Sequence, residues 1–299
     1  MALVMTGATS GIGLEAMRAL LARGIQQPVI GVRNPASIPL DLVKRVDARP
    51  LDLNSLASVR AFAATLADTP IEALVLNAGG QVGDVAKSAD GFERTFAVNH
   101  LAHYLLARLL APQMATAGRI VLTASGTHDP ERKTGMPPPR HADAFKLADP
   151  AKDPERDASA GTAGRRAYSA SKLCNVMTAR ELALRHKTDR PDLMVASFDP
   201  GFVPGTGLVR DYPAPVSWAF RKVLPLLLRR ASVSTPEISG ALLADLVLLD
   251  SYAKARGDYW SVLQRQLKLV EPSALARDAA VSAKLWDDSA KLVGLAHSA

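Results

Sequence analysis

The sequence has little of what marks a secreted or membrane-bound protein. Its one cysteine is Cys174, which excludes an intramolecular disulfide framework and fits a reducing compartment. No segment approaches the roughly 18–20 uninterrupted apolar residues of a membrane span. Residues 2–5 are already strand-like, and no basic region or long apolar region of a signal peptide precedes them. We therefore expect a cytoplasmic protein.

Clusters of basic residues are also missing, although the chain carries an excess of positive charge. Lys and Arg number 36 against 29 Asp and Glu, which gives a formal net charge of +7. Because these residues are scattered, the chain lacks the basic footprint of a nucleic-acid-binding protein, and we predict no nucleic-acid partner. A phosphorylated cofactor would explain part of the excess, and a solvated surface the rest.

Short apolar segments alternate with amphipathic ones along most of the chain. Hydrophobic residues make up 48% of the sequence, which is enough to bury a sizeable core. Strands are predicted at residues 2–6, 29–32, 73–76, 119–123, 193–198 and 258–260, and helices at 12–23, 55–67, 91–114 and 167–186, then after Pro236 and in a last helix holding Leu275 and Trp286. This alternation predicts an α/β fold with a doubly wound parallel sheet covered by helices on both faces. We expect residues 1–299 to form a single domain, because no repeat or linker interrupts them.

Two segments break the alternation. Residues 126–166 are rich in Pro, Gly and charged residues, and a structureless loop of this length is usually functional or mobile. Residues 202–235 combine Pro and Gly with the apolar run 223–228, which basic residues flank. The second segment is either a substrate lid or a surface that contacts a membrane. A lid of Leu and Val indicates a bulky hydrophobic substrate, without defining which one.

A glycine-rich turn joins the first strand to the first helix. Gly7, Gly11 and Gly13 can adopt positive φ and let the backbone approach a phosphate closely. The following helix start offers unpaired N–H groups and the positive end of its dipole to a pyrophosphate. A strand before the turn and a helix after it are the context that a dinucleotide site requires. The same turn places Thr9, Ser10 and Ile12 beside the phosphates, with Ser10 as a hydrogen-bond donor.

Arg33 follows the second strand and indicates which nicotinamide cofactor is bound. An acidic residue at this point usually holds the ribose 2′-hydroxyl of NAD, whereas an arginine suits the 2′-phosphate of NADP. The sequence therefore favours NADP(H).

The spacing of Gly7, Gly11 and Gly13 resembles that of the short-chain dehydrogenase/reductase family. Further family-like motifs follow in the same order: Asp52-Leu53, Asn77-Ala78-Gly79 and Pro200-Gly201. The resemblance runs from residue 2 to about residue 262 and implies a Rossmann-type fold. It also implies cofactor contacts from these motifs, with Asp52 and Leu53 near the adenine, and from Val203 and Thr206 near the nicotinamide.

Tyr168 and Lys172 lie four residues apart, so on a helix they share a face. A nearby ammonium is expected to lower the tyrosine pKa from its usual value near 10, which lets Tyr168 exchange a proton at neutral pH. The resemblance implies that Ser125 steadies the substrate oxygen, that Asn99 holds a proton-relay water and that Lys172 contacts the nicotinamide ribose. The predicted reaction moves a hydride between nicotinamide and a carbonyl or alcohol carbon, with Tyr168 as the proton carrier.

The long gap between Ser125 and Tyr168 is similar to that of the retinol-dehydrogenase-like and protochlorophyllide-oxidoreductase-like members of the family. Residues 98–103, 171–175 and 206–208 also look like the second group. Cys174 stands where that group carries a cysteine proposed to act in catalysis or pigment binding. At about 100° per residue, however, Cys174 points roughly 200° away from Lys172, which favours a small buried thiol.

Two alternatives to a dark carbonyl reductase stay open. One is a light-dependent C=C reductase of the protochlorophyllide type, and the other is an NADP-binding sensor without catalysis. The complete set of Asn99, Ser125, Tyr168 and Lys172 argues against a sensor. His100 and His103 have no metal partners at suitable spacing and are expected on the helix surface or in packing. A homodimer also stays open, because many members of the family are dimers or tetramers.

Overall fold

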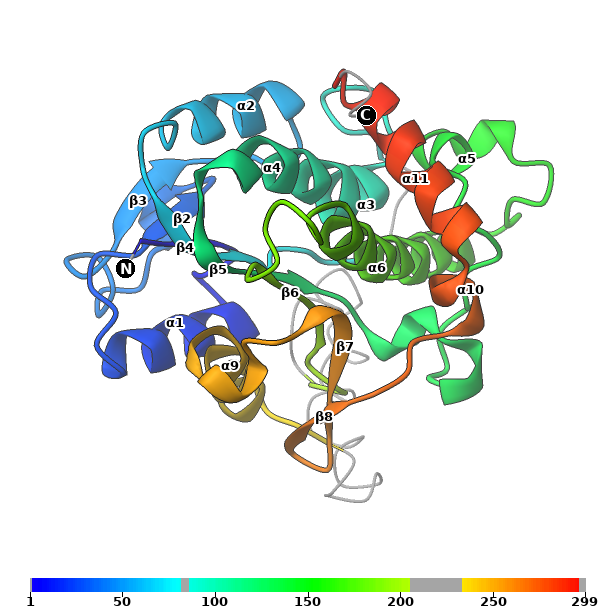
Figure 1. Cartoon of the computed structure of the whole chain (residues 1–299). Coiled ribbons are helices and arrows are strands. Elements are labelled where there is room, and N and C mark those ends of the chain that lie inside the picture. Colours follow the sequence, from blue (N-terminus) through cyan, green and yellow to red (C-terminus); the bar gives the residue numbers. More distant parts are fainter. Residues whose placement is uncertain (1, 82–85, 205–232, 296–299) are drawn as a thin grey trace.

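A single twisted sheet organises the molecule (Figure 1). The computed structural model describes residues 2–81, 86–204 and 233–295. Within these ranges the sheet has eight strands in the order β3-β2-β1-β4-β5-β6-β7-β8, and only β8 is antiparallel to its neighbour. The strands are β1 Leu3–Thr6, β2 Val29–Val32, β3 Asp47–Pro50, β4 Ile71–Leu76, β5 Met114–Thr123, β6 Met194–Asp199, β7 Arg256–Leu263 and β8 Gln266–Leu269. This order confirms the predicted α/β, Rossmann-type fold.

Helices cover both faces of the sheet, because the strands are apolar on both sides. In β1, Leu3 and Met5 belong to the core beneath one helical layer, and Val4 belongs to the core of the other layer. The first layer contains α1 Gly11–Ala22 and α9 Pro236–Leu248, and the second contains α2 Leu56–Ala64, α4 Ala102–Leu110 and α6 Ala160–Arg185. Figure 1 shows these two layers on opposite sides of the strands, with α11 Ala279–Leu292 packed beside α6.

The helix expected over residues 91–114 is shorter and is not regular. It begins at Arg94 because Glu93 caps it, with the carboxylate accepting the N–H groups of Thr95 and Phe96 at 2.9 and 2.6 Å. One π-helical turn, Ala97–Leu101, separates α3 Arg94–Phe96 from α4. A single 3-10 turn then leads into β5, which begins at Met114 rather than at residue 119.

The segment 126–166 was expected to be a structureless loop, and this expectation is wrong. It contains three 3-10 turns, the short helix α5 Ala144–Ala148 and the first turns of α6, which begins at Ala160 rather than at residue 167. Local caps explain the short elements, because the Asp143 carboxylate accepts the N–H groups of Phe145 and Lys146. We refer to residues 126–166 as the insert.

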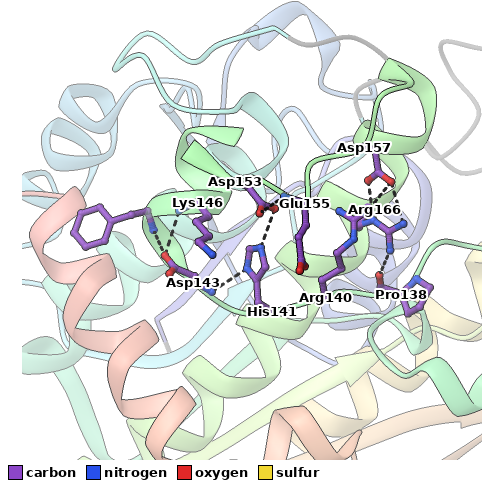
Figure 2. A network of polar contacts seen from close by, with 10 residues as sticks. Pro138, Arg140, His141, Asp143, Lys146, Asp153, Glu155, Asp157 and Arg166 are labelled. Atoms are coloured by element: carbon purple, nitrogen blue, oxygen red, sulfur yellow. Dashed lines mark hydrogen bonds and ion pairs between the residues drawn. The ribbon is translucent and has the colours of Figure 1, made fainter. Parts of the chain in front are cut away.

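The insert is tied to α6 by a network of partly buried charges (Figure 2). The Asp157 carboxylate accepts hydrogen bonds from Arg166 at 2.7 and 3.1 Å and from Arg140 at 2.7 Å. Arg166 also donates to the carbonyl oxygen of Pro138 at 2.6 Å. Arg166 lies two residues before Tyr168, so these bonds join the insert to the helix that carries the predicted proton donor.

The C-terminal region differs from the prediction in one further respect. Leu275 and Trp286 lie on two helices, α10 Ala274–Arg277 and α11, because Asp278 ends the first and caps the second through the Val281 N–H. Most of the predicted lid, 202–235, lies outside the described residues, including the apolar run 223–228 and Thr206. Its two ends meet where Phe202 and Val233 form a parallel bridge. In the described part of the chain, no helix is both long and apolar enough to cross a membrane.

Candidate active site

The glycine turn at the end of β1 leaves no space for a Cβ at Gly7 or Gly13. Gly7 adopts a φ of +70°, and a Cβ there would lie 2.6 Å from the Cα of Ala78. A Cβ on Gly13 would overlap the carbonyl oxygen of Gly7. Gly11 begins α1, Ser10 is its exposed N-cap residue, and Thr9 and Ile12 are partly exposed beside it. The turn therefore presents a helix N-terminus without side chains in the way, as a bound pyrophosphate requires.

Asn77 and Thr6 lock this turn to the end of the neighbouring strand β4. The Asn77 side chain donates to the Gly7 carbonyl oxygen at 3.2 Å and accepts from the Thr123 hydroxyl, also at 3.2 Å. The Thr6 hydroxyl oxygen accepts the N–H groups of Asn77 and Ala78, each at 3.0 Å. These bonds bring the ends of β1, β4 and β5 together, which places the predicted Asn77-Ala78-Gly79 motif beside the glycine turn.

Arg33, Asp52 and Leu53 follow β2 and β3 at the same edge of the sheet. Arg33 is exposed, and within the described ranges no carboxylate pairs with its guanidinium. Asp52 is partly buried and accepts the Asn54 N–H at 3.0 Å, which fixes the loop after β3. The positions expected to recognise the adenosine end of a cofactor are therefore gathered beyond the carboxyl ends of parallel strands, where α/β sheets bind ligands.

The four predicted catalytic residues also lie close together. The Lys172 ammonium is 5.7 Å from the centre of the Tyr168 ring and donates to the Thr123 carbonyl oxygen at 3.0 Å. The Ser125 side chain hydrogen-bonds Tyr168. A Cβ on Gly79 would lie 2.9 Å from Asn99 Oδ1 and 3.3 Å from Lys172 Nζ, so the Asn77-Ala78-Gly79 loop touches the same cluster.

Burial controls the protonation of Tyr168 and Lys172. Burial raises the pKa of Tyr168 to about 12, and the negative charge of Asp199 adds to this shift while the Ser125 hydrogen bond opposes it. Burial lowers the pKa of Lys172 to about 8, and Asp199 opposes that shift. The expectation that the lysine would lower the tyrosine pKa is therefore wrong for the protein alone, because desolvation of the buried hydroxyl raises that pKa. Tyr168 consequently keeps its proton at neutral pH.

Asn99 lies in the π-helical turn and is fully buried, not exposed on the helix. Its side chain accepts the Gly80 N–H at 3.0 Å and donates to the Gly80 carbonyl oxygen at 2.9 Å and to Ser171 Oγ at 3.0 Å. Its main-chain carbonyl oxygen lies 3.1 Å from His103 Nδ1 and accepts from the Asn175 amide at 3.1 Å. The widened turn allows side chains to use a carbonyl that an α-helix would bond internally, and such turns often mark functional sites.

His100 and His103 were expected either on the helix surface or in packing, and packing is the position that the structure shows, since both are fully buried. His100 bonds Ser289 across 3.0 Å and stacks on Phe96. His103 bridges Asn99 and the Thr6 hydroxyl, so it belongs to the site. No catalytic role was predicted for His103, although its position four residues after Asn99 was a usable signal. Thr6, Thr123, Asn175 and Asp199 were likewise missed.

Pro200 and Gly201 follow β6 directly beside this cluster. Gly201 has a φ of +73°, and a Cβ there would lie 2.6 Å from the Val262 carbonyl oxygen. The Pro200 carbonyl oxygen accepts from Ser239 on α9 at 2.7 Å, and Val203 is buried. Thr206 lies outside the described residues, so its predicted cofactor contact stays a prediction.

Cys174 is fully buried among apolar side chains of the layer that contains α4 and α6. Burial raises the pKa of its thiol far above the usual value, which keeps it protonated. A protonated thiol inside the core neither binds a ligand nor attacks one. Cys174 is thus a packing residue, as its angle on the helix predicted.

Comparison with known proteins identifies the family. The protein-family model described as short chain dehydrogenase matches residues 1–135. Over 318 aligned residues the chain is 33% identical to a protochlorophyllide reductase of Avena sativa, covering 98% of this chain and 99% of that protein. The chain therefore belongs to the short-chain dehydrogenase/reductase family of oxidoreductases. Within that family it is similar to the protochlorophyllide reductases, including one from Chlamydomonas reinhardtii at 32% identity over 98% of this chain and 77% of that protein.

Solved structures agree with this fold. An uncharacterised protein from Mycobacterium paratuberculosis superposes with a TM-score of 0.71 at 25% identity, covering 100% of this chain and 95% of that one. A short-chain dehydrogenase/reductase from Burkholderia multivorans with bound NADP superposes with a TM-score of 0.60 at 21% identity, covering 90% and 99%.

Proposed function

We propose that this protein is an NADPH-dependent reductase that acts in the dark on the carbonyl group of a bulky hydrophobic substrate. The observation that carries the proposal is the buried contact of Ser125, Tyr168 and Lys172, in which Tyr168 is held protonated. A protonated hydroxyl beside a second hydroxyl suits the reduction of a C=O bond, because the new alkoxide must receive a proton.

The residues at the ends of β1 and β2 fit the cofactor. A Cβ would fill the space at Gly7 and at Gly13, so the turn is shaped for a phosphate against bare backbone. Arg33 is exposed without a carboxylate partner among the described residues, and it would hold the 2′-phosphate of NADP. Solved structures of the same fold are described with bound NADP or NADPH. When bound, NADPH supplies the hydride.

The side chains of the chain itself supply the proton and the positioning. Tyr168 donates its proton to the substrate oxygen, and the Ser125 hydroxyl orients that oxygen and stabilises charge on it. Lys172 is fixed by the Thr123 carbonyl and would reach the nicotinamide ribose. Its positive charge, retained below a pKa of about 8, stabilises the tyrosinate left after proton transfer.

A second candidate is reduction of a C=C bond, as in the protochlorophyllide reductases that this chain resembles over nearly its whole length. The same proton donor serves both reactions. The burial of Cys174 favours the carbonyl reaction, because this thiol does not reach a ligand. The apolar run in 223–228 suits either substrate.

The test measures NADPH oxidation by the wild-type protein over bulky ketones, aromatic aldehydes and protochlorophyllide, each in darkness and under illumination. We expect turnover of a carbonyl compound in darkness. Turnover of protochlorophyllide alone, and in light alone, would contradict the proposal and support the second candidate. NADPH binding without oxidation of any compound would contradict both and support a sensor.

A further inference from the structure

Asp199 ends β6 and is a buried carboxylate for which the sequence predicts no role. The residue is 2% exposed. Oδ2 accepts hydrogen bonds from the hydroxyls of Tyr259 at 2.9 Å and Ser261 at 2.7 Å and from Arg132 at 3.0 Å. Oδ1 accepts the Gly201 N–H at 3.0 Å. Four donors from three parts of the chain therefore fix this carboxylate behind the candidate active site.

Arg132 brings the insert to that carboxylate. Besides Asp199, its guanidinium donates to Ser261 at 3.0 Å and lies 5.4 Å from the centre of the Tyr259 ring. A Cβ on Gly126 would lie 3.1 Å from Arg132 Nη1 and 3.3 Å from Asp199 Oδ2. The residue directly after Ser125 is therefore packed against the ion pair.

His128 holds Ser125 from the same cluster. Its Nε2 accepts the Ser273 N–H at 3.2 Å, so Nδ1 carries the proton and donates to the Ser125 carbonyl oxygen at 2.7 Å. The ring packs edge-on against Tyr259, with the centres 4.9 Å apart. Ser125 is thus positioned by a chain of contacts that leads back to Asp199.

We propose that Arg132 and Asp199 are positioning residues: the pair fixes the start of the insert against β6, and its balance of charge sets the electrostatic field at Lys172 and Tyr168. The start of the insert, around Arg132, then helps to position the candidate active site and is not an appended loop. This inference depends on the proposed function in one respect only, namely which reaction the positioned residues serve.

The charges around Lys172 decide in which direction a change at Asp199 or Arg132 shifts the Lys172 pKa. Asp199 faces it from β6 and raises its pKa, while the buried His103 faces it from α4 and is neutral, its own pKa lowered to about 4. Arg132, from the insert, pairs with the Asp199 carboxylate at 3.0 Å. In a site of low polarity, the guanidinium cancels part of the carboxylate field. Removing Asp199 should therefore lower the Lys172 pKa, and removing Arg132 should raise it.

The test follows the ¹³Cε resonance of Lys172 against pH in the cofactor-free protein, assigned with the Lys172→Arg variant. We expect Asp199→Asn to lower the Lys172 pKa and Arg132→Gln to raise it, each by about half a unit or more. Arg132→Lys restores the charge and should return the value toward that of the wild type. If Asp199→Asn does not fold, the comparison of the two Arg132 variants decides.

Asp157→Asn is the matched control, because it breaks another, partly buried ion pair of the insert, and Asp157 is not among the charges that shift the Lys172 pKa. Equal shifts in all variants, shifts of the same sign at Arg132 and Asp199, or no shift would overturn the proposal. Because the readout needs neither substrate nor NADPH, it is independent of whether the proposed reductase activity is found.

Discussion

The hydroxyl of Thr6 donates a hydrogen bond to Nε2 of His103 across 3.0 Å. The direction follows from the partners, because the Thr6 oxygen already accepts two backbone N–H groups, from Asn77 and Ala78. His103 must therefore carry its proton on Nδ1, from which it donates to the Asn99 carbonyl oxygen. One neutral imidazole thus links the cofactor turn after β1 to the π-helical turn that holds Asn99.

We expect His103→Phe to destabilise the protein by about 2–3 kcal/mol, because the Thr6 hydroxyl would be buried without an acceptor. His186→Phe is the control, since His186 is the partly exposed residue at the end of α6 and, among the described residues, its side chain pairs with Asp189 alone. That control should stay within about 0.5 kcal/mol of the wild type. Urea unfolding measures both values, and an equal loss in the two variants would contradict the assigned role.

The buried histidines predict a loss of stability on acidification. Burial lowers the pKa of His100 to about 3 and that of His103 to about 4, both below the unfolded value near 6.5. The unfolded chain therefore binds more protons below pH 6.5, and the contribution present above that pH is lost as the pH falls toward the folded values. Each histidine contributes a slope of up to about 1.4 kcal/mol per pH unit.

Urea unfolding between pH 7.5 and 5 should show this slope in the wild type. His103→Gln should show a smaller slope, because one titrating group is gone. A wild-type stability that stays constant or rises as the pH falls from 7.5 to 5 would contradict the assignment of both histidines as buried and neutral.

Gly13→Ala should weaken NADPH binding at least tenfold, because the added Cβ overlaps the Gly7 carbonyl oxygen and forces the turn apart. Gly24→Ala is the matched control. Gly24 also has a positive φ, of +93°, but nothing lies within 4 Å of its added Cβ. The control should cost about 1 kcal/mol of stability and leave NADPH affinity unchanged. Fluorescence titration with NADPH distinguishes the two variants. Equal affinities would contradict the role of the glycine turn in binding NADPH.

Asp157→Asn should loosen the insert without unfolding the sheet. The variant weakens charge-assisted bonds to Arg166 and Arg140, worth about 1.5–3 kcal/mol of local stability (Figure 2). Trypsin cleavage at the exposed Lys133, Lys152 and Arg156 should then accelerate about tenfold. Asp41→Asn, which removes an exposed pair with Arg18, should leave the cleavage rate unchanged. Unchanged cleavage in the Asp157 variant would show that the network does not hold the insert.

The periodic parts of the structure were predictable from the sequence. Strand–helix alternation gave the parallel sheet, and the positions of Gly7, Gly13 and Arg33 led to the cofactor edge, because these signals are local. Tyr168 and Lys172 were predictable as a pair because an i, i+4 spacing fixes a shared helix face. The capping aspartates of the insert were also local, but the Pro- and Gly-rich composition obscured them.

The remaining features depend on contacts between distant segments. Arg132 and Asp199 meet only after the insert folds back onto β6, and no rule of sequence spacing predicts such a pair. The π-helical turn at Asn99 depends on the side chains of Asn175 from α6 and His103 from α4, which bond to its carbonyl oxygen. The shift of the Tyr168 pKa was predicted with the wrong sign because burial, which depends on the whole fold, raises that pKa.

The most direct test of the account compares NADPH oxidation in the dark by the wild type and by Tyr168→Phe, on a substrate that the wild type turns over. NADPH affinity and thermal unfolding are measured on the same preparations. We predict that the variant stays folded, binds NADPH within about twofold of the wild type and loses roughly 10²–10⁴-fold in kcat, because the proton donor is gone. A folded, NADPH-binding variant with nearly unchanged kcat would contradict the assignment of Tyr168 as the proton donor.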